Sequence, residues 1–104
     1  MPIKARCGRA DEIPPGGSKV VQVRERAVAI FNLAGTLYAI ENTCPHQGGP
    51  LGEGYLEENG VISCPWHGWT FDLKTGVSPL DRDVRVGCYP VRVEEGLIVV
   101  ELPG

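Results

Sequence analysis

The sequence predicts an all-β fold, an antiparallel β sandwich or barrel formed by a single domain of 104 residues. No stretch repeats its apolar residues with the 3.6-residue period of an amphipathic helix, so we expect almost no helix. Instead, short alternating or β-branched segments recur at regular spacing, and clusters of Gly, Pro, Asn and Asp separate them. A chain of this length buries roughly two-thirds of its unfolded surface, which is enough for a core without disulfides.

The first part of the chain predicts a strand followed by a meander. A Pro-Pro-Gly-Gly loop follows the first predicted strand, and the next strand alternates apolar with polar residues, as a half-buried strand does. The third is more uniformly apolar, and Asn32-Leu33-Ala34-Gly35 turns it into its hairpin partner. The predicted strands are residues 3–9, 19–24, 27–33 and 36–41.

The second part predicts a short hairpin and two closing strands. Glu58-Asn59-Gly60 indicates a hairpin turn, and Asn-Gly favours type I′. Pro90 lies inside a predicted strand, which therefore belongs at an edge or carries a bulge. Glu94-Glu95-Gly96 turns the chain into its last strand. The predicted strands are residues 55–57, 61–64, 70–72, 85–93 and 97–102.

Two short motifs lie on the loops between these strands. One reads C-P-H-Q-G-G-P-L from Cys44, and the other reads C-P-W-H-G from Cys64. Each supplies one thiol and one imidazole, so Cys44, His46, Cys64 and His67 are the candidate metal ligands and cofactor-binding residues. Residues i and i+2 of an extended segment project to the same face, so Cys44 and His46 can reach one site together. The hairpin between the motifs brings the second pair face to face with the first.

Both motifs resemble those of the Rieske iron–sulfur family, whose pattern is C-x-H, a spacer of about this length, and C-x-x-H. The flanking residues C-P-H-Q-G-G-P-L-G-E-G and C-P-W-H-G-W-T-F-D-L-K-T-G match as well. The resemblance implies one [2Fe-2S] cluster per chain, with one iron held by Cys44 and Cys64 and the other by His46 and His67. It also implies a single Rieske domain over residues 1–104, a β sandwich or barrel base with a cluster-binding subdomain inserted at about 42–72.

Other chemistry fits these four residues less well. Two Cys and two His also satisfy tetrahedral zinc, but structural zinc modules usually place their two Cys before their two His. The order here is Cys, His, Cys, His. Four residues at metal-ligand spacing also explain the pattern better than Cys–His nucleophilic catalysis does.

The neighbours of the motifs predict a low reduction potential. High-potential members of the family carry a serine and a tyrosine after the second motif, and one extra cysteine in each motif. Trp69 and Phe71 stand at the first two positions, and Gly49 and Trp66 at the other two. Fewer hydrogen bonds to sulfur leave the reduced form less stabilised, so we expect about −150 mV. Because reduction raises the pKa of an iron-bound histidine, the potential should also fall at alkaline pH.

The resemblance favours a ferredoxin, an electron-transport component of an aromatic-ring dioxygenase system rather than an enzyme. It would take single electrons from a flavin-dependent reductase and pass them to a terminal oxygenase. The alternative within the family is the small subunit of an assimilatory nitrite reductase. Mostly apolar residues at the expected tip would provide a transient docking surface, a cover for the cluster, or both; they are Pro45, Gln47, Pro50, Leu51 and Trp66.

Composition excludes several other classes of function. The formal net charge is −3, without a basic patch, so we expect no nucleic-acid partner. No apolar run is long enough to span a bilayer, and the first residues lack a signal-peptide core, so we expect a cytoplasmic monomer without a membrane partner. Cys7 and Cys88 are left over; the main expectation is two buried, inert thiols on strands, with a disulfide between them as the alternative.

Overall fold

The computed structural model describes residues 3–44, 48–66 and 69–103, which form ten strands and two short 3-10 helices. The strands are β1 (Ile3–Arg9), β2 (Ser18–Val23), β3 (Arg26–Leu33), β4 (Thr36–Glu41), β5 (Tyr55–Leu56), β6 (Val61–Ser63), β7 (Thr70–Asp72), β8 (Cys88–Tyr89), β9 (Val91–Glu94) and β10 (Leu97–Leu102). The 3-10 helices are η1 (Ala10–Glu12) and η2 (Leu51–Glu53). The all-β prediction is confirmed.

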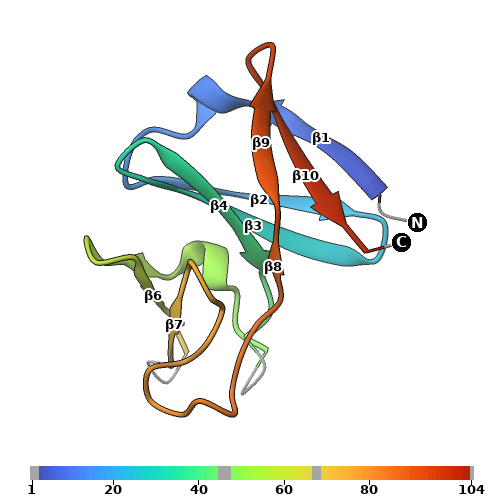
Figure 1. Cartoon of the computed structure of the whole chain (residues 1–104). Helices are drawn as coiled ribbons and strands as arrows, with labels where there is room; N and C mark the ends of the chain where they lie inside the picture. The colour runs from blue at the N-terminus through green and yellow to red at the C-terminus, as the bar shows by residue number, and fades with distance from the viewer. Residues whose placement is uncertain (1–2, 45–47, 67–68, 104) are drawn as a thin grey trace.

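The strands form three antiparallel sheets, ordered β1-β10-β9, β2-β3-β4-β8 and β5-β6-β7. The first two sheets form the base, which holds both ends of the chain (Figure 1). The third sheet lies at the opposite end of the molecule, beside the long segment that joins β7 to β8 (Figure 1). No described helix is long and apolar enough to cross a membrane.

The sheet β2-β3-β4-β8 separates two buried clusters. On β3, Val28 and Ile30 pack into the cluster shared with β1 and β10, and Ala29 and Phe31 pack into the cluster that contains Cys44 and the third sheet. All four side chains are buried. Successive side chains of a strand point to opposite faces, so a strand covered on both faces has an almost continuous apolar sequence. This explains why residues 27–33 look more apolar than the neighbouring strands.

Two hairpin turns are of type I′, but the one turn that the sequence predicts to be type I′ is not. The loops Ala34-Gly35 and Glu95-Gly96 each have positive φ at both residues, as in a type I′ turn. The type I′ prediction for 58–60 was wrong, because Gly60 alone has positive φ there. The Gly60 N–H donates to the Glu57 carbonyl at 3.0 Å, and the Glu57 N–H donates to the Val61 carbonyl at 2.8 Å. This is a three-residue loop that ends in a glycine bulge, so the predicted hairpin forms with a different connection.

The predicted strand 85–93 is two strands in two different sheets. Cys88–Tyr89 pairs with β4, whereas Val91–Glu94 pairs with β10. Pro90 lies between them, where its missing N–H removes no ladder hydrogen bond, and its carbonyl accepts from the Glu101 N–H at 2.9 Å. The proline therefore marks the point at which the chain passes from one base sheet to the other.

The two cysteines outside the motifs are both free, so the alternative of a disulfide between them was wrong. Cys7 on β1 is buried as expected, and burial raises the pKa of its thiol. Cys88 is exposed, contrary to the prediction, because β8 is a two-residue edge strand. Its sulfur nevertheless turns inward toward the Leu73 carbonyl, at 3.8 Å, and burial and then the charge of Asp72 raise its pKa.

Candidate metal centre

The first motif lies on a loop whose ends are joined by backbone hydrogen bonds. The Cys44 N–H donates to the Gly49 carbonyl at 2.9 Å, and the Gly48 N–H donates to the Cys44 carbonyl at 2.8 Å. An antiparallel bridge between Thr43 and Pro50 continues the pairing outward. Backbone hydrogen bonds thus join Cys44 to the described residues at the other end of the motif, Gly48 and Gly49.

The second motif is closed in the same way. The Cys64 N–H donates to the Trp69 carbonyl at 2.6 Å, and the pairing of Ser63 with Thr70 continues it into β6 and β7. In both loops the bond joins the cysteine to the residue five positions on. The two candidate thiols therefore occupy equivalent positions relative to the hydrogen bonds that close their motifs.

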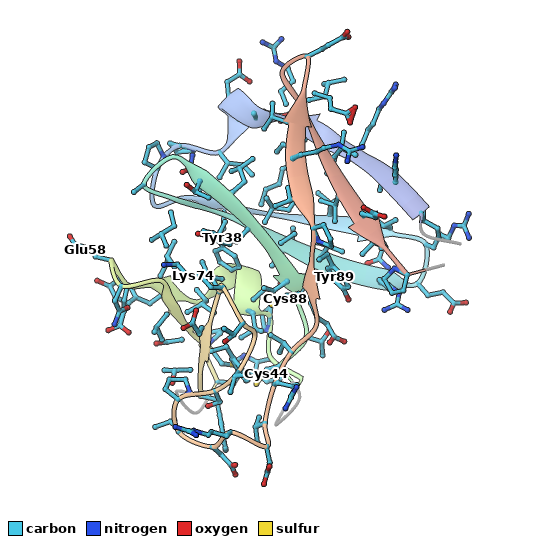
Figure 2. The ribbon with its side chains drawn as sticks, viewed as in Figure 1. Tyr38, Cys44, Glu58, Lys74, Cys88 and Tyr89 are labelled. Atoms are coloured by element: carbon cyan, nitrogen blue, oxygen red, sulfur yellow. The ribbon has the colours of Figure 1, made fainter. Side chains whose placement is uncertain are left out.

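The structure places the two thiols in one cluster of buried apolar residues, with 1 % of Cys44 and 3 % of Cys64 exposed. Burial raises the pKa of the Cys64 thiol, a hydrogen bond from the Trp66 N–H lowers it, and the interaction with the Cys44 side chain raises it again. Figure 2 shows Cys44 among the loops at the end of the molecule away from the β9–β10 hairpin.

The two predicted imidazole ligands, His46 and His67, lie outside the described residues, as do Pro45 and Gln47. Within the described ranges, no group of three or more His, Cys, Asp or Glu side chains gathers as a metal site would require. The geometry on which the site can be judged is therefore that of the two thiols and their surroundings.

Hydrogen bonds join the helix η2, which follows the first loop, to Asn42 and to Ser18 of β2. The Leu51 N–H donates to the Asn42 carbonyl at 2.7 Å, and the Gly52 N–H donates to the Asn42 side-chain oxygen at 2.7 Å. The Ser18 hydroxyl on β2 donates to the Gly52 carbonyl at 2.8 Å. The sequence does not reveal the roles of Ser18 and Asn42, because neither belongs to a motif. Both bind the backbone of Gly52, which carries no side chain that would indicate the contact.

A close contact joins the two loops. A methyl group on Gly49 would lie 2.8 Å from the Cys64 Sγ and 3.0 Å from the Trp66 Cγ. Real Cβ atoms essentially never lie within 3.0 Å of another heavy atom, so the distance to sulfur is prohibitive and the distance to the indole is very tight. The first loop therefore passes against the second at a residue without a side chain.

The predicted tip residues divide into covered and exposed groups. Leu51 is fully buried, so it covers the site and provides no docking surface. Trp66 is 49 % exposed. The loop after β7 adds an exposed apolar residue, Leu80, and β5 adds Tyr55.

The surroundings of the thiols suit a thiolate-bound metal group. Soft sulfur ligands favour zinc, copper(I) and iron–sulfur clusters, and a hydrogen-bond donor to the sulfur stabilises its negative charge. The Trp66 N–H is such a donor to Cys64. Phe71 stands where high-potential members of the family carry a tyrosine, and it is fully buried in the apolar cluster that contains both thiols. Trp69 packs against that apolar cluster. The thiols and the apolar cover thus fit the sulfur side of an iron–sulfur centre.

Comparison with known proteins identifies this arrangement. The model of the Rieske [2Fe-2S] domain matches residues 4–90. The 3-phenylpropionate/cinnamic acid dioxygenase ferredoxin subunit of Shigella flexneri serotype 5b (strain 8401) is 42 % identical over 77 residues, which cover 73 % of each chain.

Two solved structures have the same fold. A chain of the complex of reduced oxygenase and oxidized ferredoxin in carbazole 1,9a-dioxygenase superposes with a TM-score of 0.85 at 33 % identity, covering 94 % of this chain and 92 % of that one. A protein assigned as the small subunit of an NADH-dependent nitrite reductase, from Mycobacterium tuberculosis, superposes with a TM-score of 0.92 at 26 % identity, covering 100 % and 98 %.

Proposed function

The chain belongs to the Rieske [2Fe-2S] domain family, and we propose that it is a ferredoxin that passes single electrons from a flavin-dependent reductase to a terminal oxygenase. It is an electron carrier and not itself an enzyme, as its relatives are ferredoxin components of dioxygenase systems. Its cofactor is one [2Fe-2S] cluster, which when bound accepts and releases one electron.

The proposed ligands are Cys44 and Cys64 for one iron and His46 and His67 for the other. The observation that supports this most directly is the meeting of the two buried thiols from equivalent positions of two loops. We assign these loops and the third sheet to a cluster-binding subdomain at about residues 42–72, within a single domain. Around the thiols, burial excludes water and the Trp66 N–H stabilises negative charge on the Cys64 sulfur.

A ferredoxin is favoured over a nitrite reductase subunit by sequence identity. The ferredoxin subunit described above is 42 % identical over 77 residues, and the ferredoxin component of a 2,4-dinitrotoluene dioxygenase system is 35 % identical over 95 residues. Among the superposed structures, the chain from the complex of oxygenase and ferredoxin is 33 % identical and the nitrite reductase small subunit is 26 % identical. The zinc alternative has no comparable support, because the matched family is defined by its iron–sulfur cluster.

The proposed docking surface consists of exposed apolar residues on the second loop and on the loop after β7. Trp66 is half exposed and Leu80 is 67 % exposed, and small exposed apolar patches suit transient partners. One solved structure similar to this chain is a complex of oxygenase and ferredoxin, which supports an oxygenase as one partner. The free thiols Cys7 and Cys88 support a reducing compartment, and we place the protein in the cytoplasm.

The four cysteines provide the test. We expect the purified protein to contain two irons and two sulfides, and to lose both when Cys44→Ser or Cys64→Ser is introduced. The matched changes Cys7→Ser and Cys88→Ser should keep the full iron content, because neither thiol belongs to the proposed site. Iron and sulfide analysis and the EPR spectrum of the reduced protein measure the outcome. One zinc per chain, or equal loss of iron in all four variants, would overturn the proposal.

For the cluster-bearing protein, reduction by a flavin-dependent reductase with NADH, followed by reoxidation on adding a terminal oxygenase, tests the carrier role. Protein-film voltammetry across a range of pH tests the ligand set, because histidine ligation requires a potential that falls at alkaline pH. A potential that stays flat across that range contradicts the assignment of His46 and His67.

A further inference from the structure

Gly49 is required for its small volume and not for its backbone conformation. Its φ lies outside the left-handed region in which glycine is favoured, and the residue is buried. The Cys64 sulfur and the Trp66 indole of the second loop occupy the space where a side chain would project, with the Trp66 Cδ2 only 3.1 Å from that position. The contact therefore involves the backbone of one loop and two side chains of the other.

Trp66 acts on the neighbouring sulfur in two ways. Its backbone N–H donates a hydrogen bond to the Cys64 sulfur, which a change of side chain leaves in place, and part of its indole lies against Gly49 while the residue is 49 % exposed. Gly49 and Cys64 are both buried, and the indole and the sulfur border the same small space beside Gly49. Water near a charged sulfur raises the local dielectric, and the apolar shell of a metal site controls that access.

We propose that the seating of the Trp66 indole on Gly49 holds the two loops together and keeps water from the Cys64 sulfur. Gly49 and Trp66 are thus positioning residues: neither binds iron, and both act through Cys64. The inference rests on the proposed function, because it takes Cys64 to be a cluster ligand. It goes further by assigning the rate of cluster loss and part of the reduction potential to a noncovalent contact between the loops.

The direction of the change in potential follows from the charge on the site. Reduction adds a negative charge, and water stabilises that charge better than an apolar cover does. Removing the indole therefore favours the reduced form and raises the potential. A purely structural role for Trp66 predicts faster loss of the cluster without this positive shift.

The experiment compares Trp66→Ala, Trp66→Phe and Tyr55→Ala in the cluster-bearing protein. Tyr55 is an exposed aromatic residue on β5 and serves as the control for removing a ring from the surface. We expect Trp66→Ala to lose its visible absorption to a chelator about fivefold faster, the factor that about 1 kcal/mol supplies. Its potential should rise, whereas Trp66→Phe and Tyr55→Ala stay within about twofold in rate and unchanged in potential.

A second set of variants tests the contact itself. Gly49→Ala should speed cluster loss, and it should do so less in a Trp66→Ala background, because the clash with the ring has been removed while the clash with sulfur remains. Gly87→Ala is the matched control, since an added methyl group meets only the end of Tyr89, at 3.3 Å. Additive effects of the two changes overturn the contact as the cause. Where Trp66→Ala assembles no cluster, the comparison of Trp66→Phe with Trp66→Leu replaces it, and equal rates overturn the inference.

The two hypotheses fail in different ways. A wild-type protein without iron and sulfide overturns the proposed function. A wild-type protein with a full cluster, together with a Trp66→Ala variant that matches it in both rate and potential, overturns only the role of the indole.

Discussion

Phe71 is the residue at which a single hydroxyl group tests the control of the potential. Its ring is fully buried on β7, in the same cluster as Cys44 and Cys64. We expect Phe71→Tyr to raise the reduction potential by about 40 mV, because a new hydrogen bond to sulfur stabilises the reduced form by about 1 kcal/mol. Protein-film voltammetry measures the change.

The matched control for this prediction is Phe31→Tyr. Phe31 is equally buried and belongs to the same cluster, but it lies on β3 of the base. It should cost stability as an unpaired buried hydroxyl does and leave the potential unchanged. A fall in the potential of Phe71→Tyr, or equal shifts in both variants, would show that another term dominates.

The sequence predicts which residue types surround the thiols, but not how they touch. In the sequence, Gly49 and Trp66 stand at the two positions where high-potential members of the family carry their extra cysteines. The structure shows that these two residues contact each other. Their contact depends on the approach of two loops separated by a hairpin, which no local pattern encodes. The positions of Cys44 and Cys64 follow from motif spacing, since each lies at the start of a loop between predicted strands.

The short helix η2 is the element that connects the first loop to the base through Gly52. A methyl group on Gly52 would clash with the Val20 side chain of β2 and lie 2.9 Å from the Asn42 side-chain oxygen. We expect Gly52→Ala to lower the free energy of unfolding by about 1–3 kcal/mol, the usual cost of inserting a group into a packed interior. Urea unfolding measures it, and the exposed Gly87→Ala change, expected within about 0.5 kcal/mol, is the control. A cost for Gly52→Ala no larger than this control contradicts the tight packing of η2.

At the same scale, the boundaries of hairpins are predictable and their connections are not. The apolar run 27–33 and its partner 36–41, with the turn residues between them, place β3 and β4 within one residue of their observed limits. The turn at Asn59-Gly60 departs from type I′, whereas Ala34-Gly35 adopts it. Register is fixed by the buried faces of the paired strands, so the loop takes the conformation that the register allows. Pro90 similarly marks an interruption in the sequence, but the change of sheet depends on distant partners.

For the molecule as a whole, the two buried clusters predict a difference in response to loss of the cofactor. The proposed ligands Cys44 and Cys64 belong to the apolar cluster shared with the third sheet, whereas the apolar cluster between β1, β10 and the central sheet contains neither. Metal binding stabilises the parts that supply its ligands. Removing the cofactor should therefore speed amide hydrogen exchange in β5, β6 and β7 by at least about tenfold, with little change in β1 and β10.

Hydrogen exchange with mass spectrometry of the cluster-bearing and cluster-free proteins measures this difference. The Cys44→Ser variant provides a cluster-free protein without chelator, and Cys88→Ser provides its cluster-bearing counterpart. Uniform loss of protection across both base sheets would show that the domain folds only as one unit with its cofactor. It would thereby contradict the division at about residues 42–72.

The two faces of the central strand β3 belong to the two apolar clusters. Even-numbered Val28 and Ile30 face one compartment, and odd-numbered Ala29 and Phe31 face the other. Parity along one short strand therefore decides whether a substitution reaches the redox end or the end that holds the chain termini. Substitutions at the odd positions of β3 disturb the apolar cluster that contains Cys44 and Cys64, and substitutions at the even positions disturb the packing of the central sheet against β1 and β10.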